Sequence, residues 1–438
     1  MLSPQLRSGL KRFRRQRRAF WSLGVITILF VVCLPAELLC NSKPIFIRFN
    51  GRSYFPVFKR YTEADFGGAR HVVPDYRSPG FLELVGHGEP HGEGDQAVPT
   101  PPPPPATDVL DMFDDETSGE PGPGRPADGG GKENSAAAAA RILADFDPEP
   151  WDVEVTERCH STADEAVEPA WMLWPPVRYD YAYIAQGSQA GRDALASPWG
   201  QVIPGSGKHY GSSWVDGHYL GTDDRGRDVL ARLVYGFRVS MIFGLALAIS
   251  GTIAGAVIGA LQGFFGGLID LLGQRVTEIW GSLPQLYLLM ILSSLLARNI
   301  YVLFVILNLT SWMGMAAYMR AEFLRGRQLD YVLAARGLGV SSPAIMFRHI
   351  LPNSLTPIIT FLPFSISGGI LALVSLDFLS LGVPSPYPSL GELLAQGQNN
   401  LRATWIIFPT FLVLSGTVTL LTFVGDGLRN AFDPRKSG

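Results

Sequence analysis

The apolar runs in the second half of the chain constrain its fold more than any other feature. From Val234 to the end, 205 residues carry only 20 charged side chains, and a water-soluble domain of this size would not tolerate the apolar runs between them. A bilayer core about 30 Å thick is crossed by roughly 20 apolar helical residues. We therefore expect an all-α membrane protein with six transmembrane helices. They are predicted at residues 19–40, 234–263, 279–296, 300–319, 355–381 and 404–428.

The distribution of basic residues predicts the orientation of these helices. Residues 1–18 form a basic tail with seven bases and no acid, and the segments expected on the same side hold nine further bases. These segments are the loop around Arg275, the loop 320–353 and the tail 429–438. Since cytoplasmic segments are enriched in Lys and Arg, we expect a multi-pass protein with both termini in the cytoplasm. In a bacterium with two membranes this would be the inner membrane. The apolar run at 19–40 is too long for a signal-peptide core and lacks a small-residue cleavage pair, so we interpret it as a retained anchor.

The segment 41–233 is then a large periplasmic loop. It holds 30 of the 39 acids and 17 of the 36 bases, so the overall net charge of −3 averages an acidic loop with a basic membrane part. The net charge therefore gives no reason to expect a nucleic-acid partner, and we expect none. Asn50-Gly51 between short alternating runs predicts a β-hairpin, and the aromatic run 171–183 predicts a return to order. Between them, about 86–168 is rich in Pro, Gly, Ala and acids, which is typical of a disordered insertion.

We expect no catalytic group, metal site or bound cofactor in this chain. The run 205–208 resembles the end of a phosphate-binding loop, but Val202 stands where the first glycine is needed and His209 where a Ser or Thr is needed. His87 and His91 are surrounded by Gly and Pro, so no helix brings them onto one face. The acidic run 111–116 is interpreted as solvated charge.

Two features inside the predicted spans suggest functions. Four glycines recur every fourth residue and predict a ridge where another helix approaches closely; a flexible gating helix is the alternative. They are Gly251, Gly255, Gly259 and Gly263. Asp377, and Glu37 likewise, lies near the outer end of a span, where the carboxylate either reaches interfacial water or lines a substrate path. The residues do not decide between these two roles.

The stretch 330–353 is the most informative part of the chain. Residues 330–337 predict a short helix with the small residues Ala334 and Ala335, and Gly339 permits the positive φ that ends a helix. Ser342 at the cap and Pro343 in the first turn predict the start of a second helix, which Pro352 would stop. From the residues alone, this segment is either a helix resting on lipid headgroups or a docking element.

This stretch resembles the EAA motif of ABC importer permeases, whose short helix docks into a cleft of the ATPase. Leu333 stands in place of the motif's Glu, and His349 in place of its Ile, which implies a weaker charge contact with the ATPase. Carried over by position, the ATPase-coupling residues are Asp330, Ala334, Ala335, Gly339, Arg348, Leu351 and Pro352.

Further segments narrow the resemblance. Residues 220–240, 378–401 and 425–435 are similar to dipeptide and oligopeptide permeases, and the start of the chain, with 44–66, resembles the YejE-type branch for oligopeptides and microcin C. The resemblance implies a type I, MetI-like permease core in the last five helices, residues 234–428. It also implies contacts with outer partners through the hairpin region 46–58 and through the motif Gly221, Thr222, Asp223, Gly226, Arg227 and Asp228.

The resemblance implies a non-catalytic subunit that imports peptides by alternating access. Its expected partners are a second permease, a cytoplasmic ATPase that holds ATP and Mg, and a periplasmic solute-binding protein. A secondary transporter driven by an ion gradient is the alternative, but such proteins carry midplane acids and repeated halves, which this sequence lacks. A membrane-anchored enzyme would need a set of nucleophile and base that the outer loop does not offer.

Overall fold

The computed structural model describes residues 4–68, 70–86, 170–184, 195–202, 209–210, 213–214, 217–295 and 299–432. The predicted insertion at 86–168 lies outside these ranges, apart from residue 86, as do the run 205–208, His87, His91 and the acidic run 111–116.

A small domain follows the first helices, and we call it the outer domain after the side of the membrane predicted for it from the sequence. The predicted hairpin is confirmed: β1 (Phe46–Phe49) pairs antiparallel with β2 (Arg52–Tyr54), and Asn50 and Gly51 between them both have positive φ, 48° and 72°. β3 (Trp171–Leu173) pairs with the other edge of β1, giving the order β2-β1-β3. The remaining short elements are η1 (Glu63–Phe66), α4 (Pro79–Leu84), β4 (Gln201–Val202) and β5 (His209–Tyr210).

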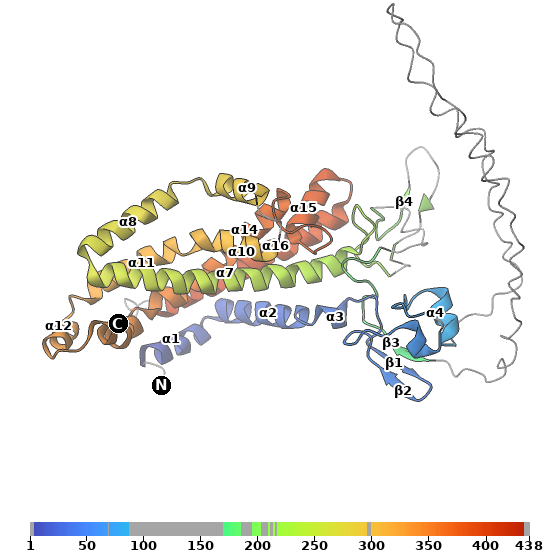
Figure 1. The fold of residues 1–438 in the computed structure, drawn as a ribbon, viewed down its shortest axis with the longest axis horizontal. Helices are drawn as coiled ribbons and strands as arrows, with labels where there is room; N and C mark the ends of the chain where they lie inside the picture. The colour runs from blue at the N-terminus through green and yellow to red at the C-terminus, as the bar shows by residue number, and fades with distance from the viewer. Residues whose placement is uncertain are drawn as a thin grey trace, which may run out of the picture.

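Helices make up the rest of the described chain (Figure 1). The first part contains α1 (Pro4–Arg15), α2 (Arg17–Cys33) and α3 (Ala36–Leu39). The second contains α7 (Val229–Phe265), α8 (Gly267–Gly281), α9 (Gln285–Leu295), α10 (Ile300–Ser311), α11 (Met313–Gly326), α12 (Asp330–Gly337), α13 (Ser342–Ala344), α14 (Leu355–Phe378), α15 (Leu390–Asn399) and α16 (Thr404–Phe432). Between α13 and α14 the chain continues as a π-helix, η3 (Ile345–Ile350), and a 3₁₀ turn, η4 (Leu351–Asn353).

Four helical stretches are long and apolar enough to cross a membrane: α7, α10 with α11, α14 and α16. α1 and α2, joined by a 91° bend, bring the number within the described residues to five if they count as one span. The apolar run predicted at 279–296 is divided between α8 and α9, and Pro284 lies at the break, where it cannot donate a helical hydrogen bond. A count of six spans therefore stays a prediction.

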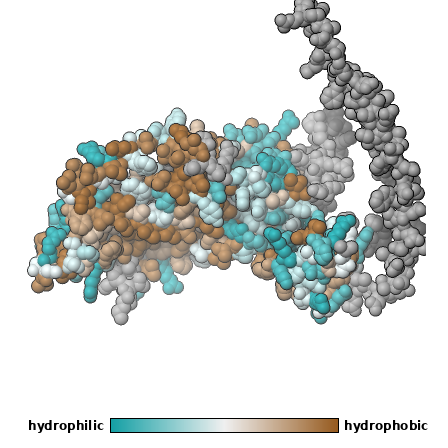
Figure 2. All heavy atoms as spheres, viewed as in Figure 1, coloured by the Kyte–Doolittle hydropathy of each residue, from teal (hydrophilic) through white to brown (hydrophobic). Residues whose placement is uncertain are grey.

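The long helix α7 is the centre of the helical part. It packs along α11 and α14, and α16 packs against α14 and α2. The largest cluster of buried apolar side chains joins α2, α7, α14, α15 and α16. Apolar atoms cover much of the visible face of the helices, whereas polar atoms gather at the two ends and on the outer domain (Figure 2). Such a surface is expected where lipid surrounds the helices.

The two ends of the helical part carry different elements. α1 and the end of α16 share one buried cluster, and Figure 1 places them at the same end as α12. The sheet of the outer domain and β4 lie at the opposite end. The predicted coupling helix is therefore separated from the outer domain by the length of α7.

Candidate functional site

The predicted short helix is confirmed with the bounds of α12. One side of α12 is anchored: Val332 and Ala335 are buried in a cluster with Phe323 of α11 and with Ala260 and Phe264 of α7. Ala334 lies on the other side and is exposed, although it is adjacent to Ala335 in the sequence. Of the two alanines of the motif, only Ala334 therefore offers a surface to a partner.

The exit from α12 is a left-handed turn at Gly339, as expected from the sequence. Gly339 has a φ of 75°, which is unfavourable for residues with a Cβ atom. The N–H of Leu338 donates to the carbonyl of Ala334 at 3.0 Å, and the N–H of Val340 donates to that of Ala335 at 3.1 Å. These bonds satisfy carbonyls that the helix end would otherwise leave unpaired.

The segment after the turn differs from the prediction in two details. Its cap residue is Ser341 and not Ser342, and Pro352 does not stop the helical path but lies in the 3₁₀ turn η4. The π-helix before η4 shifts the register, so the proline meets no regular helix interior. Arg348 is exposed, and Leu351 and Pro352 are half-buried.

Large apolar side chains are exposed around this turn. Leu338 is 83% exposed and Phe347 is 63% exposed, and Leu333 is half exposed. All three lie at the end of the helical part that carries α12, where polar atoms gather (Figure 2). The motif comparison did not single out Leu338 or Phe347. An exposed apolar patch rimmed by polar residues is typical of a protein interface. We call Leu333, Ala334, Leu338 and Phe347 the inner patch.

Three of the four predicted glycines lie against α11, and the fourth lies against the end of α10. A Cβ atom on Gly255, Gly259 or Gly263 would approach the backbone carbonyl of Trp312, Ala316 or Arg320, respectively, closer than 3.0 Å. Gly251 lies similarly against Ser311. The last three glycines and the three carbonyl groups that they face both advance in steps of four residues, so α7 and α11 follow each other through several turns. α7 and α11 are consequently in backbone contact.

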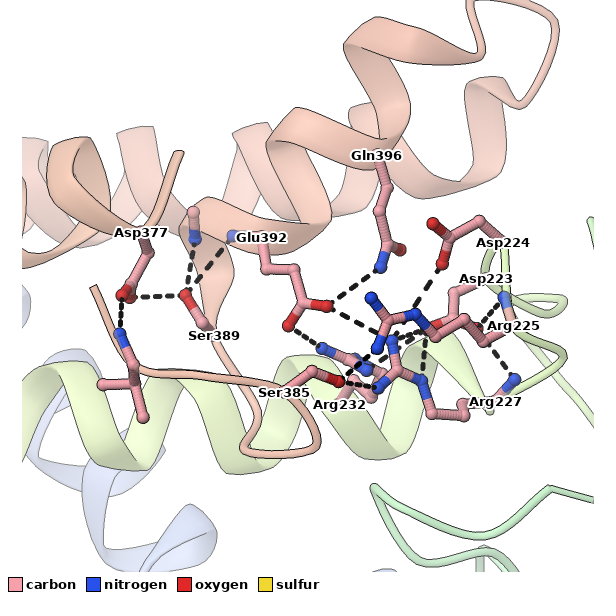
Figure 3. A network of polar contacts seen from close by, with 12 residues as sticks. Asp223, Asp224, Arg225, Arg227, Arg232, Asp377, Ser385, Ser389, Glu392 and Gln396 are labelled. Carbon is pink, nitrogen blue, oxygen red and sulfur yellow. Dashed lines mark hydrogen bonds and ion pairs between the residues drawn. The ribbon is translucent and has the colours of Figure 1, made fainter. Parts of the chain in front are cut away.

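At the outer end, buried charges tie the start of α7 to α15 (Figure 3). Arg232 lies 2.6 Å from Glu392 and 3.2 Å from Asp223, and Arg227 lies 2.7 Å from Asp223 and 3.3 Å from Glu392. Both guanidinium groups and Asp223 are buried, and the mutual pairing offsets part of the loss of hydration, although Nε and Nη1 of Arg232 have no hydrogen-bond partner among the described residues. We call these four residues the outer charge cluster.

The predicted outer contact motif is mostly turned inward. Gly221, Thr222, Asp223, Gly226, Arg227 and Asp228 are buried. Asp228 caps α7 by accepting from the N–H of Ala231 at 2.6 Å, and it contacts Nδ1 of the buried His218 at 2.9 Å. Within the loop 221–228 the half-buried Asp224 and the exposed Arg225 offer charged groups to a partner. Burial raises the pKa of Asp224 above its ordinary value, with a further contribution from Asp223.

Asp377 is 6% exposed, so the expectation that its carboxylate reaches interfacial water is wrong. The carboxylate accepts hydrogen bonds from the Ser389 hydroxyl and, at 2.9 Å, from the N–H of Val383. It thereby fastens the loop after α14 to the start of α15 (Figure 3). Glu37, in contrast, is exposed and pairs with Arg238 at 2.8 Å.

A cavity of about 390 Å³ lies between α7, α10, α11 and α14. Its polar lining consists of hydroxyl groups, among them Thr252, Ser311, Tyr318 and Ser365. The Thr252 hydroxyl is buried and, among the described residues, has no hydrogen-bond partner. The described lining contains no Asp, Glu, Lys or Arg, and Asp377 lies elsewhere. The cavity therefore offers hydrogen bonds and apolar contact without charge.

Comparison with known proteins places the chain in a family. Residues 251–438 match the family model for the binding-protein-dependent transport system inner membrane component. The peptidoglycan transport system permease YejE of Agrobacterium fabrum is 36% identical over 99% of this chain and 94% of its own length. The inner membrane ABC transporter permease YejE of Escherichia coli is 35% identical over 100% of this chain and 99% of its own length.

A more distant relative matches only half of the chain. The oligopeptide transport system permease OppC of Haemophilus influenzae is 36% identical over 50% of this chain and 70% of its own length. The two YejE proteins are matched across nearly their full length, and several helices here are apolar enough to cross a membrane. The chain is therefore a multi-pass inner membrane protein that belongs to the binding-protein-dependent transport system inner membrane component family, among ABC permeases of the YejE type.

Proposed function

We propose that this chain is one permease subunit of an ATP-driven importer that moves peptides from the periplasm to the cytoplasm. ATP and Mg would be bound by a separate cytoplasmic ATPase, which hydrolyses ATP and moves the permease, while the permease itself supplies no catalytic group. Relatives named for oligopeptide and peptidoglycan transport support a peptide substrate. Peptide-nucleotide compounds such as microcin C belong to the proposed substrate range through the resemblance to the YejE branch.

The observation that carries this proposal is the exposed inner patch on an anchored helix. Leu338 and Phe347 would lose most of their contact with water in the cleft of a partner, which favours docking. Arg336 and Arg348 supply positive charge at the same end, and Asp330 supplies a negative charge at the first turn of α12. The ATPase would therefore meet an apolar centre with charged residues around it, as in other protein interfaces.

Motion of the docked helix would reach the membrane part through buried contacts. Ala335 and Val332 pack in the same cluster as Phe323 and Phe264, and the Arg336 guanidinium lies 5.5 Å from the ring centre of Phe264. A displacement of α12 would thus be passed to α11 and α7 together, because their backbones are in contact along the glycine ridge. We propose that this displacement opens the path alternately to the two sides.

The substrate path would include the uncharged cavity beside Thr252. Peptides present many backbone donors and acceptors, which hydroxyl groups such as Ser365 and Tyr318 can match. A lining without fixed charge would not repel acidic or basic side chains, so peptides of both signs would pass. In this proposal Asp377 is a positioning residue for α15 and does not touch the peptide.

The arrangement around this subunit follows from the same proposal. Both termini, α12 and the loop 320–353 would lie in the cytoplasm, and 41–233 in the periplasm, where a solute-binding protein delivers the peptide. The permease core would span 234–428 with the MetI-like fold. A second permease would complete the pore, and the exposed apolar side chains of α8 and α9 would be available to pack against it or against lipid.

Photo-crosslinking of the assembled transporter tests the docking. A photoreactive amino acid at Ala334 should capture the ATPase, whereas the same residue at the neighbouring, 7% exposed Ala335 should capture it weakly or disrupt the helix. In proteoliposomes with all partners, labelled peptide should accumulate only with ATP. Crosslinks from Ala334 to lipid alone, with the ATPase present, or uptake driven by an ion gradient without ATP, would contradict the proposal.

A further inference from the structure

The first helix meets the second at nearly a right angle. α1 and α2 are separated by Gln16 and bend by 91°. α2 continues as an apolar helix toward the outer domain, so α1 runs across the direction of the membrane-crossing helices. A basic helix in this position lies along the membrane surface and not through it.

Contacts with the end of α16 hold α1 in this orientation. Phe13 is buried in one cluster with Ala19, Val424 and Ala431. Gly9 lies against the ring of Phe432, and a Cβ atom on Gly9 would clash with that ring. One face of α1 is therefore fixed to the inner end of a membrane helix, and the remaining faces are left to the surroundings.

The remaining faces carry concentrated positive charge. The exposed bases of α1 and of the first turn of α2 are Lys11, Arg14, Arg15, Arg17 and Arg18. None of these five forms an ion pair with another residue of the described chain. The sequence contains no acid before Glu37, so the charge is not neutralised locally. A polyanionic partner is the electrostatic complement of such a cluster.

The neighbouring apolar residues point to lipid as the source of the negative charge. Leu10 is 62% exposed beside Lys11, and Trp21 is 68% exposed one turn into α2. Trp is enriched at the level of lipid headgroups, and an amphipathic helix buries apolar side chains at the same depth. The bases therefore lie where phosphate groups of the bilayer are found, continuous with the lipid-facing side of α2.

We propose that Lys11, Arg14, Arg15, Arg17 and Arg18 form a binding site for anionic phospholipid headgroups at the cytoplasmic surface. By holding α1 on the membrane, the lipid also holds the inner end of α16 through Phe13 and Gly9. The inference depends on α2 crossing the membrane but not on docking of the ATPase at α12, so either proposal can fail without the other.

Spin-labelled lipids test the site on the full-length protein in nanodiscs. Cys33 and Cys40 are buried, so the third cysteine of the sequence is removed by Cys159→Ser and a fluorophore is attached to the variant Leu10→Cys. Its quenching by spin-labelled phosphatidylglycerol and by spin-labelled phosphatidylcholine gives the ratio of the two association constants. We expect phosphatidylglycerol to be preferred by about tenfold or more, since each base near an anionic surface contributes a factor of about five. The triple variant Lys11→Gln, Arg14→Gln, Arg15→Gln should bring the ratio close to one.

Two control variants are compared with the triple Gln variant. One changes the same residues but keeps their charge, and the other removes positive charge elsewhere in the protein. The exchange Lys11→Arg, Arg14→Lys, Arg15→Lys keeps the charge and should keep the preference. Arg275→Gln with Arg325→Gln removes two exposed bases that pair with Glu278 and Glu322 and should also keep it. The proposal is overturned if the ratio is near one in the protein with all five bases, or if it is unchanged in the triple Gln variant. It is also overturned if the fluorophore becomes shielded from its surroundings only after the ATPase is added.

Discussion

Arg232 in α7 donates a hydrogen bond of 2.6 Å to the carboxylate of Glu392 in α15, although 160 residues separate them in the chain. Asp223 lies 3.2 Å from the same guanidinium, and Arg232 and Asp223 are fully buried. Replacing Arg232 by Ala would leave Asp223 and Glu392 sharing the single positive charge of Arg227, so one negative charge of the outer charge cluster would be uncompensated. We expect a loss of about 3–5 kcal/mol of stability, measured by thermal or denaturant unfolding in detergent.

Arg238→Ala is the matched control for this prediction. Arg238 also lies in α7 and pairs with a carboxylate, Glu37, at 2.8 Å, but this pair is more accessible to water, since Arg238 is 20% and Glu37 48% exposed. Its removal should cost less than about 1 kcal/mol. Equal losses in the two variants would mean that burial of the outer charge cluster is not what makes it important.

The backbone contact between α7 and α11 predicts that Gly259 does not tolerate a larger residue. Gly259→Ala places a Cβ atom against the carbonyl of Ala316, so the helices must separate. We expect a loss of about 1–3 kcal/mol, read from the unfolding midpoint. Gly416→Ala in α16 serves as the comparison, because no atom lies within 4 Å of its added Cβ, and it should be neutral or slightly stabilising.

The left-handed turn after α12 predicts an uncoupled transporter when Gly339 is changed. A β-branched residue is strongly disfavoured at a φ of 75°, so Gly339→Val should displace Leu338 and alter the inner patch. In proteoliposomes, ATP-dependent peptide uptake should fall by about tenfold or more while the ATPase alone stays active. Gly337→Ala, at a helical position with open space around it, should leave uptake unchanged; a loss there would argue against the turn as the cause.

The uncharged cavity predicts that an added charge creates selectivity. Ser365→Asp would place a carboxylate in the lining, so uptake of acidic peptides should fall by about tenfold or more relative to basic peptides. Ser365→Asn adds similar volume without charge and should reduce both classes alike. Uptake competition between an acidic and a basic labelled peptide gives the ratio, and an unchanged ratio would place the path elsewhere.

The ion pair between α8 and α11 predicts a stability effect that is independent of pH in the neutral range. Nη2 of Arg320 donates a hydrogen bond of 2.8 Å to Oδ2 of Asp270. Hydrogen bonding from this guanidinium lowers the pKa of Asp270 below its ordinary value of 3.8. A carboxyl whose pKa is lower when folded contributes stability above the ordinary value and loses it as the pH falls through the lowered one. Asp270→Asn should therefore cost about 1 kcal/mol equally at about pH 5 and about pH 8. A cost that differs between the two would show that another group is involved.

Local patterns in the sequence were enough to predict the local elements. Asn50-Gly51 gave the hairpin because both residues tolerate positive φ, and the bounds of α12 and the turn at Gly339 follow from small-residue and glycine signals. The spacing of the glycines in α7 also predicted which face approaches another helix. Each of these features depends on residues that are neighbours along the chain.

Features that depend on distant partners could not be predicted in this way. Nothing near Asp377 in the sequence indicates that Ser389 and the N–H of Val383 will enclose its carboxylate. The position of Glu392 beside Arg232 likewise depends on how α15 packs on α7. Hydropathy does not predict the division of the run 279–296, because it averages across Pro284, whereas the hydrogen-bond pattern is interrupted there.

The length of α7 has a mechanical consequence. Its 37 residues form one rod of about 55 Å, with the α12 cluster at one end and the outer charge cluster at the other. A rod pivoted at its base moves most at its far tip, and a tilt of about 10° would swing that tip by roughly 10 Å. A small displacement of one end of α7 by the proposed ATPase would thus become a large displacement at the opposite end, and no helix would have to unfold or re-form.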